Sequence, residues 1–191
     1  MKISNLTKRF GEKVVFDNLS LEIKENQVTY IMGESGCGKT TLLRILSGLD
    51  KDYTGKIPVL DNVSYVFQEP RLFPTLTVQK NVEIVGEPTE FTSEYALKLV
   101  ELQDEKLSFP NTLSGGMKMR VALARAIYHN KSVYLMDEPF SALDEEMKSR
   151  ILPQIFTFFA IKNKTVIVIS HDKSEAEKYG DNIIILKNLK V

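Results

Sequence analysis

Short apolar runs alternate with amphipathic stretches along most of the chain, and this alternation predicts the fold class. Near-continuous apolar strands are expected at residues 27–32, 63–68, 132–137, 165–170 and 182–187. Helical periodicity is expected between them, at residues 39–47, 144–160 and 173–179. Apolar strands that alternate with helices are typical of a parallel sheet covered on both faces. The sequence therefore predicts an α/β fold built on a mostly parallel sheet.

The N-terminal part of the chain has a different pattern. Alternating segments between Ile3 and Ile31, with turn signals at residues 10–12 and 25–26, predict a small antiparallel β lobe that leads into the strand before Gly33. Residues 52–61 are expected to be short and turn-like. An antiparallel lobe therefore precedes and flanks the parallel core.

The middle of the chain is helical in its periodicity. Helix starts are expected at Thr77, at Thr92 or Ser93, and at Ser114. Pro153 predicts a kink or a break in the later helix at 144–160, because proline lacks the backbone N–H that a helix interior needs. We expect one domain over residues 1–191, with a helical lobe inserted at about residues 72–130.

Composition excludes several classes of protein. Lys and Arg number 25, as do Asp and Glu, so no overall basic field exists to bind nucleic acid. The single cysteine, Cys37, excludes an internal disulfide, and two histidines leave little room for a histidine-rich metal site. The N-terminus lacks the apolar core of a signal peptide. The longest apolar runs fall well short of the roughly 20 residues that span a bilayer, so any role at a membrane requires a partner.

Residues 30–43, YIMGESGCGKTTLL, carry the strongest chemical signal. A strand, a glycine-rich turn and a helix follow one another, and the turn matches the pattern G-x-x-x-x-G-K-[ST]. Backbone N–H groups of such a turn bind polyphosphate, Lys39 neutralises its β and γ phosphates, and Thr40 offers a hydroxyl to Mg²⁺. The predicted nucleotide-binding residues of this loop are Gly33, Glu34, Ser35, Gly36, Cys37, Gly38, Lys39, Thr40 and Thr41.

Two further motifs extend this chemistry. The apolar strand VYLMDE ends in Asp137, which is expected to help hold Mg²⁺, and Glu138, which is expected to orient or deprotonate the attacking water. The alternative is a pair of acids that only caps the strand. The segment LSGGM, residues 113–117, opens the next helix with Ser114, Gly115 and Gly116. A hydroxyl, close backbone approach and the helix dipole favour an anion there. An ordinary helix cap is the alternative there.

In their order, these motifs resemble those of the nucleotide-binding subunit of an ATP-binding cassette (ABC) transporter, almost end to end. GESGCGKT resembles the Walker A motif, Gln68 the Q-loop, LSGGM the signature, VYLMDE Walker B, SALD at 141–144 the D-loop, and His171 the switch histidine. The resemblance implies an ATP hydrolase with a phosphate-loop core. It also implies a head-to-tail homodimer, in which each ATP lies between one chain's phosphate loop and the other chain's signature helix.

The resemblance assigns roles to further residues. Phe10 takes the place of the aromatic that stacks on adenine, with a core or turn phenylalanine as the alternative. Gln68 would contact Mg²⁺ and the attacking water, which with Thr40 and Asp137 makes the expected metal site. The signature residues 114–116 would contact the γ-phosphate in trans, and His171 would bond to the same phosphate and hold the water together with the Walker B glutamate.

Three departures from the family pattern are visible. Met117 stands where the signature usually has glutamine, which predicts weaker or differently tuned closure rather than inactivity. The segment between Gly48 and Gln68 is shorter than usual, which predicts a trimmed antiparallel lobe. The chain also ends at Val191, which leaves no room for the C-terminal regulatory domain of some relatives. Asp144 of the D-loop is expected to help couple the two ATP sites.

The stretch QEPRLFPTLTVQKNV, residues 68–82, is similar to the Q-loop region of importer ATPases for nitrate, sulfonates, taurine and thiamine precursors, with Thr75 replacing a tryptophan. This implies permease subunits, a possible substrate-binding protein, and a cytoplasmic location on the inner face of the membrane. Phe73, Pro74 and Leu76 can form an apolar groove for a permease helix; internal packing is the alternative.

Other classes share the core motifs. An export cassette is separated from an importer only by the Q-loop stretch. A cassette acting on DNA, RNA or the ribosome would carry paired cassettes, a coiled-coil insertion or a basic face, and the sequence shows none of these. A binding-only regulatory subunit is disfavoured because Lys39, Asp137, Glu138 and His171 are all present.

Overall fold

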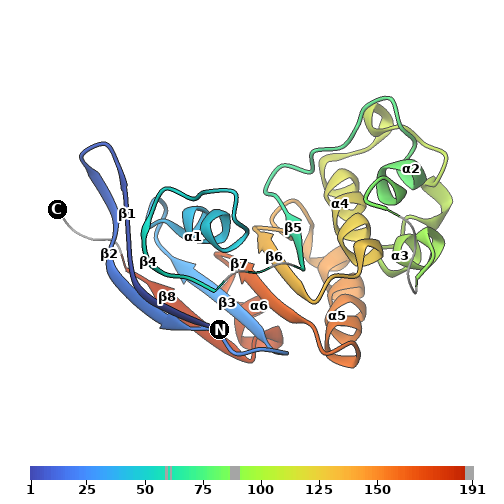
Figure 1. Ribbon diagram of the computed structural model, residues 1–191. Coiled ribbons are helices and arrows are strands. Elements are labelled where there is room, and N and C mark those ends of the chain that lie inside the picture. Colours follow the sequence, from blue (N-terminus) through green and yellow to red (C-terminus); the bar gives the residue numbers. More distant parts are fainter. Residues whose placement is uncertain (59, 61, 87–90, 188–191) are drawn as a thin grey trace.

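A parallel sheet of five strands forms the centre of the protein (Figure 1). The computed structural model describes residues 1–58, 60, 62–86 and 91–187. The strand order is β5-β6-β7-β3-β8, and each neighbouring pair is parallel. The strands are β3 (Val28–Gly33), β5 (Val63–Val66), β6 (Val133–Asp137), β7 (Thr165–Ile169) and β8 (Asn182–Leu186). The predicted parallel core is confirmed.

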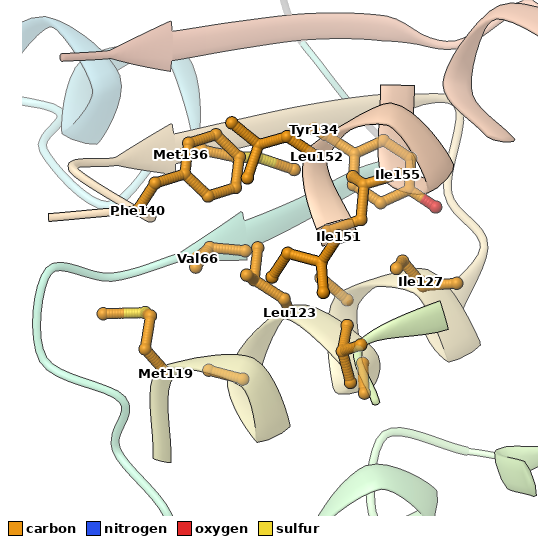
Figure 2. Packing of buried hydrophobic residues seen from close by; sticks show 14 of the residues in the cluster. Val66, Met119, Leu123, Ile127, Tyr134, Met136, Phe140, Ile151, Leu152 and Ile155 are labelled. Carbon is orange, nitrogen blue, oxygen red and sulfur yellow. The ribbon is translucent and has the colours of Figure 1, made fainter. Parts of the chain in front are cut away.

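Alternate residues of the central strands point into two separate cores. On one face, Leu135 and Ile167 pack with Leu42 and Leu43 of α1 (Lys39–Leu46) and with the antiparallel sheet. On the other face, Tyr134 and its neighbours in β6 and β7 pack against α4 (Gly115–His129) and α5 (Glu145–Ile161). Figure 2 shows β6 residues facing the aliphatic side chains of these two helices. Since successive side chains of a strand point to opposite faces, helices are needed on both sides.

The antiparallel sheet has three strands in the order β2-β1-β4. They are β1 (Lys2–Phe10), β2 (Lys13–Glu22) and β4 (Thr54–Lys56). The last of these corrects the expectation that residues 52–61 are only turn-like, although residues 59 and 61 lie outside the described residues. Three residues are too few to show an alternating pattern, and β4 forms because β1 offers a free edge. Gly55 fits there because a Cβ would lie 2.5 Å from the Asn5 carbonyl oxygen.

Three helices lie between β5 and β6. They are α2 (Val78–Glu83), α3 (Ser93–Leu99) and α4 (Gly115–His129), with the 3₁₀ turns η1 (Gln103–Glu105) and η2 (Pro110–Thr112) before α4. Thr77, Thr92 and Ser114 are their N-caps, each with a side-chain oxygen that accepts a backbone N–H from the first turn of its helix. The predicted starts are therefore confirmed. The predicted range 72–130 contains all three helices, and its treatment as an inserted lobe of one domain stays a prediction.

Two helices follow the C-terminal ends of β6 and β7. They are α5 (Glu145–Ile161) and α6 (Lys173–Tyr179). The helix α5 continues through Pro153, so the predicted break is wrong. Both Pro153 and Ser149, whose carbonyl loses its usual donor, are exposed, so water can satisfy that carbonyl. The buried residues of α5, including Ile151 and Ile155, keep the helix against the sheet on either side of the proline.

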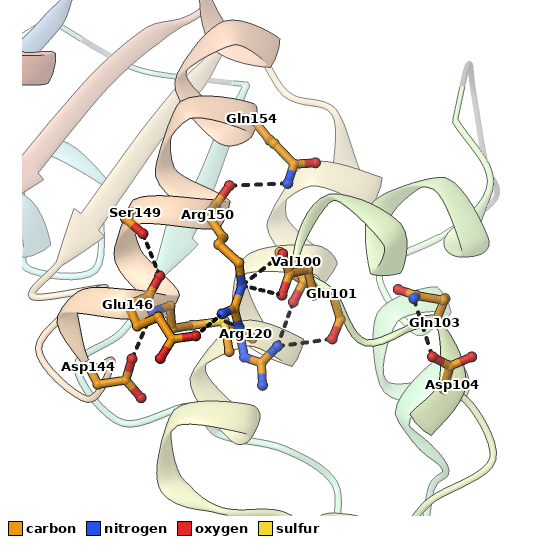
Figure 3. Close-up of polar contacts among 11 residues, drawn as sticks. Val100, Glu101, Gln103, Asp104, Arg120, Asp144, Glu146, Ser149, Arg150 and Gln154 are labelled. Carbon is orange, nitrogen blue, oxygen red and sulfur yellow. Dashed lines mark hydrogen bonds and ion pairs between the residues drawn. The ribbon is translucent and has the colours of Figure 1, made fainter.

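A polar cluster joins α4, the end of α3 and α5 (Figure 3). The Arg120 guanidinium is only 8% exposed and donates through Nη1 to the carbonyl oxygens of Val100 and Glu101, at 2.9 and 3.0 Å. Arg150 of α5 reaches the Glu101 carboxylate at 3.1 Å on the exposed side of the same cluster. Burial lowers the pKa of Arg120, which remains a cation. Arg120 therefore satisfies the carbonyls at the end of α3 from inside the protein.

We expect Arg120→Met to lower the free energy of unfolding by about 2 kcal/mol, because one buried and one partly buried carbonyl acceptor would lose a charged donor. Urea unfolding followed by circular dichroism measures this. Arg150→Met is the matched control, because its exposed ion pairs contribute little. Equal shifts of the unfolding midpoint in the two variants would contradict the special role of the buried arginine.

Candidate functional site

The functional loops meet because parallel strands end at the same edge of the sheet. The phosphate loop follows β3, Gln68 follows β5, Glu138 follows β6 and His171 follows β7. A cavity of ≈ 360 Å³ lies at this edge. Its lining residues are Phe10, Lys13, Val15, Ser35, Gly36, Gly38, Lys39, Thr40, Thr41, Gln68, Glu138 and His171. Ten of these twelve were expected from the sequence, and the fold brings them together from across the chain.

The phosphate loop holds its lysine in place. Lys39 is 7% exposed, and its ammonium Nζ donates to the carbonyl oxygens of Gly33 at 2.8 Å and Glu34 at 3.0 Å. Gly38 has φ 98° and precedes α1 without any side-chain cap, so the first N–H groups of α1 stay available for an anion. A Cβ at Gly38 would lie 2.6 Å from Val15 Cγ1, so only glycine fits there. The arrangement can bind a polyphosphate.

Two predicted loop residues support the site from beneath rather than lining it. Cys37 is 3% exposed and packs into the core under the loop. Gly33 has φ 153°, and a Cβ there would lie 2.8 Å from Cys37 Sγ. The close packing of Gly33 and Cys37 therefore fixes the shape of the turn, while the carbonyls of Gly33 and Glu34 hold the lysine.

The end of β6 offers a buried carboxylate suited to a cation. Asp137 is 4% exposed and accepts a hydrogen bond from the Thr40 hydroxyl. Burial raises the pKa of Asp137, because the charged form loses water there, and the Thr40 bond opposes this shift. Among the described residues, no three His, Cys, Asp or Glu side chains cluster as a metal site. The oxygen donors of Asp137, Thr40 and Gln68 nevertheless fit Mg²⁺, which in such sites takes few protein ligands together with phosphate oxygens.

Glu138 and His171 form a pair at the mouth of the cavity. His171 Nε2 lies 2.9 Å from Glu138 Oε1. Glu138 has φ 49°, an uncommon conformation for this residue type, and is held by its N–H, which donates to the Ile169 carbonyl at 3.0 Å, and by its carbonyl, which accepts from Ser141 Oγ at 2.9 Å. The carboxylate is thus aimed at the space beside the phosphate loop. Such a pair can hold a water and accept its proton.

Phe10 presents an exposed ring to the cavity. It is 53% exposed, and Lys8 Nζ lies 4.5 Å from its ring centroid. Lys8 is in turn held by Asp50 Oδ1 at 2.9 Å and by the carbonyl of Asp52 at 2.6 Å. Phe10 is therefore not a core residue, which removes one alternative interpretation of this position.

Sequence reasoning missed two lining residues, Lys13 and Val15. Lys13 pairs directly with Phe10 in the β1–β2 hairpin. The turn signal between them marks that hairpin in the sequence, so the pairing was available as a clue.

The signature residues do not line this cavity within one chain. Ser114 Oγ accepts a hydrogen bond from the Met117 N–H at 3.2 Å as the N-cap of α4. Gly116 packs against the D-loop, where a Cβ would lie 2.8 Å from the Ala142 carbonyl oxygen. Ser114 and Gly115 are exposed. The first turn of α4 is therefore exposed on the surface. It does not belong to the cavity that holds the phosphate loop of its own chain.

No helix among the described residues has the length and apolar character needed to cross a membrane.

Comparisons with known proteins match this arrangement. The ABC transporter family matches residues 16–141. The chain is 38% identical over 190 residues to the aliphatic sulfonates import ATP-binding protein SsuB 2 of Paraburkholderia xenovorans, covering 98% of this chain and 77% of that protein. It is 39% identical over 206 residues to an uncharacterized ABC transporter ATP-binding protein, MJ0412, of Methanocaldococcus jannaschii, covering 97% and 77%.

Solved structures agree with the sequence comparisons. The dimeric structure of the bacterial ABC transporter cassette MJ0796 superposes with a TM-score of 0.84 at 33% identity, covering 97% of this chain and 94% of that one. A dimeric post-hydrolysis state of the same cassette, bound to ADP and Pi, gives a TM-score of 0.82 at 32% identity and covers 99% and 96%. This chain, with its phosphate loop and Glu138–His171 pair at one edge of a parallel sheet, therefore belongs to the ABC transporter family as an ATP-binding, ATP-hydrolysing cassette.

Proposed function

We propose that this cassette powers a membrane importer for a small molecule. The cavity that gathers ten expected residues at the carboxyl edge of the sheet carries the ATPase part of the proposal. The importer part is supported by relatives that are import ATP-binding proteins for aliphatic sulfonates, Fe(3+) ions and sulfate/thiosulfate. The stretch 68–82 points to the same class of importer. Export ATPases share the core motifs, so the import proposal is supported by these relatives and by this stretch rather than by the motifs.

The residues of the cavity divide the work of binding. The Phe10 ring stacks on adenine, and the backbone of residues 33–41 surrounds the phosphates, with Lys39 against the β and γ phosphates. Thr40, Asp137 and Gln68 would hold Mg²⁺. When bound, this ion neutralises developing charge on the phosphates. Binding therefore presents the γ-phosphate toward the mouth of the cavity.

Hydrolysis is then carried out by the pair at the mouth. Glu138 accepts a proton from the attacking water, and His171 holds that water and the γ-phosphate in line with it. Gln68, in the same cavity, contacts the water. Through the loop that follows it, Gln68 also links the ATP site to the permease. His171 Nε2 and Glu138 Oε1 are in direct contact at 2.9 Å, so the imidazole orients the carboxylate that accepts the proton.

The exposed first turn of α4 supports assembly as a dimer. Ser114 and Gly115 are exposed and do not line the cavity that contains the phosphate loop of their own chain. In the head-to-tail dimer that we propose, they meet the γ-phosphate bound by the other chain. The solved structures of the MJ0796 cassette are dimeric, which supports this assembly. Asp144 is the N-cap of α5 and lies two residues after Ala142, whose carbonyl packs against Gly116. Asp144 couples the two ATP sites of the dimer. ATP then closes the dimer.

The loop before α2 supplies the surface for a permease. Phe73 is 49% exposed, although its backbone is fixed: its N–H donates to Asn81 Oδ1 at 2.7 Å and its carbonyl accepts from Asn81 Nδ2 at 3.0 Å. Asn81 is fully buried. Leu107 and Phe109, on a segment bonded to the start of α2, are also exposed. A rigid loop that presents an exposed phenylalanine favours a partner over internal packing. A separate substrate-binding protein completes the proposed importer on the far side of the membrane.

We expect Phe73→Asp to abolish co-purification of a multi-spanning membrane protein while leaving the Kd for Mg-ATP unchanged. The charge would remove the apolar contact, and Phe73 does not line the ATP cavity. The chain is tagged, isolated from detergent-solubilised membranes, and its partners are identified by mass spectrometry.

Ile161→Asp is the matched control, because Ile161 is also exposed, at 69%, but lies at the end of α5. Equal recovery of the membrane protein with Phe73→Asp and with the wild-type chain would reject the surface. An ATP turnover rate in the membrane-free chain equal to that of the chain bound to its membrane partner would reject the importer role.

A further inference from the structure

A largely buried lysine lies beside the catalytic pair and belongs to none of the motifs described above. Lys148 is in the first turns of α5, and its side chain is 13% exposed. Its ammonium Nζ lies 2.8 Å from Glu175 Oε1, 3.1 Å from Asp172 Oδ2 and 3.1 Å from Glu145 Oε1. Three carboxylates from two segments therefore meet one cation. Two of the three belong to the segment that starts with His171.

These contacts hold the backbone on both sides of His171. Asp172, which follows it, caps α6 by accepting the N–H of Glu175 at 3.2 Å through Oδ1, while its Oδ2 contacts Lys148. Ser170, which precedes it, donates through Oγ to Glu175 Oε2 at 3.1 Å and accepts the N–H of Asp172 at 3.0 Å. Asp172 and Glu175 contact Lys148 directly, and Ser170 is linked to it through Glu175. This ammonium group thus fixes the start of the segment that carries the histidine to α5, while the stack of Tyr179 on Phe156 joins the far end of α6 to the same helix.

The electrostatics make this lysine hard to replace. Glu175 is 6% exposed, and burial raises the pKa of its carboxyl group while the contact with Lys148 lowers it. Burial disfavours the cation of Lys148, but hydrogen bonds to Glu175, Glu145 and Asp172 outweigh burial and raise its pKa. Hydrogen bonds from Ser174 and Lys148 lower the pKa of Asp172. Without Lys148, Glu175 would be a buried carboxylate with no cation beside it.

Packing alone does not hold the histidine on this side. A cavity of ≈ 130 Å³ lies between the lysine cluster and the catalytic pair, with Lys148, Ser170, Glu138 and His171 in its walls. The His171 side chain is 52% exposed. Apart from its contact with Glu138, the imidazole faces this cavity and solvent, so its place depends largely on the backbone that carries it. That backbone is what the lysine cluster fixes.

We propose that Lys148 is a positioning residue for ATP hydrolysis, which acts through Asp172 and Glu175 to hold His171 in reach of Glu138 and the γ-phosphate. The proposal depends on the hydrolysis reaction of the cassette and not on what is transported. Lys148 also lies one turn after Asp144, the N-cap of α5. A movement of the D-loop that displaces the start of α5 is therefore transmitted to His171 through this ammonium group.

The first test is the kinetics of Lys148→Met in the full chain. We expect kcat for Mg-ATP to fall about tenfold because the histidine is misplaced, while KM and the Kd for ATP stay within about twofold because the phosphate loop is untouched. Lys148→Arg keeps the cation and is expected to retain kcat within about threefold. A rise in KM with unchanged kcat would overturn the proposal, and so would a wild-type kcat in Lys148→Met.

The single substitution leaves Glu175 unpaired, so a second variant separates folding from positioning. Lys148→Met combined with Glu175→Gln removes both charges, and the amide that replaces the carboxylate can still bond to Ser170. We expect this double variant to melt near the wild-type temperature but to keep a low kcat. Recovery of the wild-type kcat together with stability would show that Lys148 has only a structural role, and would overturn the proposal.

A double-mutant cycle tests whether the lysine acts through the histidine. In a His171→Ala background, Lys148→Met is expected to change the remaining kcat by less than about twofold, because the group that it positions is already absent. A further tenfold loss in that background would overturn the proposal.

Lys173→Met is the matched charge control. Lys173 is next to Asp172 in sequence, but its side chain is 79% exposed and contacts only Glu177, at 3.4 Å, among the ion pairs of the described residues. It is expected to leave kcat unchanged. A loss equal to that of Lys148→Met would assign the effect to net charge near the site and overturn the positioning role.

Discussion

Replacing Glu138 by glutamine is expected to reduce ATP turnover by about 10²- to 10⁴-fold while preserving the Kd for ATP, because the loss of a general base acts only on the chemical step. Glutamine has the same shape, so the unusual backbone conformation and the bonds from Glu138 to Ile169 and Ser141 can persist. The amide cannot accept the proton of the attacking water. Steady-state phosphate release and equilibrium nucleotide titration measure the two quantities separately.

The same variant tests the proposed dimer. When hydrolysis is blocked, saturating Mg-ATP is expected to shift the Glu138→Gln chain from monomer to dimer in light scattering. A persistent monomer that still binds ATP would show that Met117 or the small antiparallel sheet has weakened closure, and that a permease must complete the site.

Glu177→Gln is the matched control for the carboxylate-to-amide change, because Glu177 is 60% exposed and pairs only with Lys173 among the described ion pairs. It is expected to turn over ATP at the wild-type rate. Near-normal turnover in Glu138→Gln would remove Glu138 from the role of base.

Replacing Lys39 by methionine is expected to weaken ATP binding on the order of 100-fold, because charged hydrogen bonds to the phosphates would be lost. The structure supports a specific role, since Lys39 is 7% exposed and is held by the carbonyls of Gly33 and Glu34 within the loop. These two carbonyls therefore hold the ammonium group at the phosphate-binding turn. Titration of the purified chain with Mg-ATP, followed by calorimetry, gives the Kd.

Lys13→Met provides the comparison within the same cavity. Lys13 lines the cavity but is exposed on β2, so its removal is expected to change the Kd only about threefold, as for a solvent-screened charge. Equal losses in the two variants would indicate a general positive field rather than a phosphate-binding lysine. Unchanged affinity in Lys39→Met would reject the phosphate loop itself.

Local sequence signals were sufficient for most of the elements. The helix starts at Thr77, Thr92 and Ser114 were readable because a capping side chain bonds to its own first turn, which is a local interaction. The central strands were readable because strands buried on both faces are apolar throughout. Where the structure disagreed, a distant partner decided. The strand β4 forms only against β1, and α5 continues past Pro153 because buried residues both before and after the proline pack in the core.

The sequence by itself determined the chemistry of this protein, because the reactive groups of each motif are only a few residues apart in the chain. The glycines of the phosphate loop lie beside Lys39 and Thr40, and Asp137 lies next to Glu138. Only the tertiary structure decided how these motifs meet. The strand order β5-β6-β7-β3-β8 brings four loops to one edge, keeps the first turn of α4 away from it, and sets Lys148 among carboxylates that lie up to 27 residues further along the chain. Those contacts depend on sheet order and burial across long sequence separations, which no local pattern of residues records.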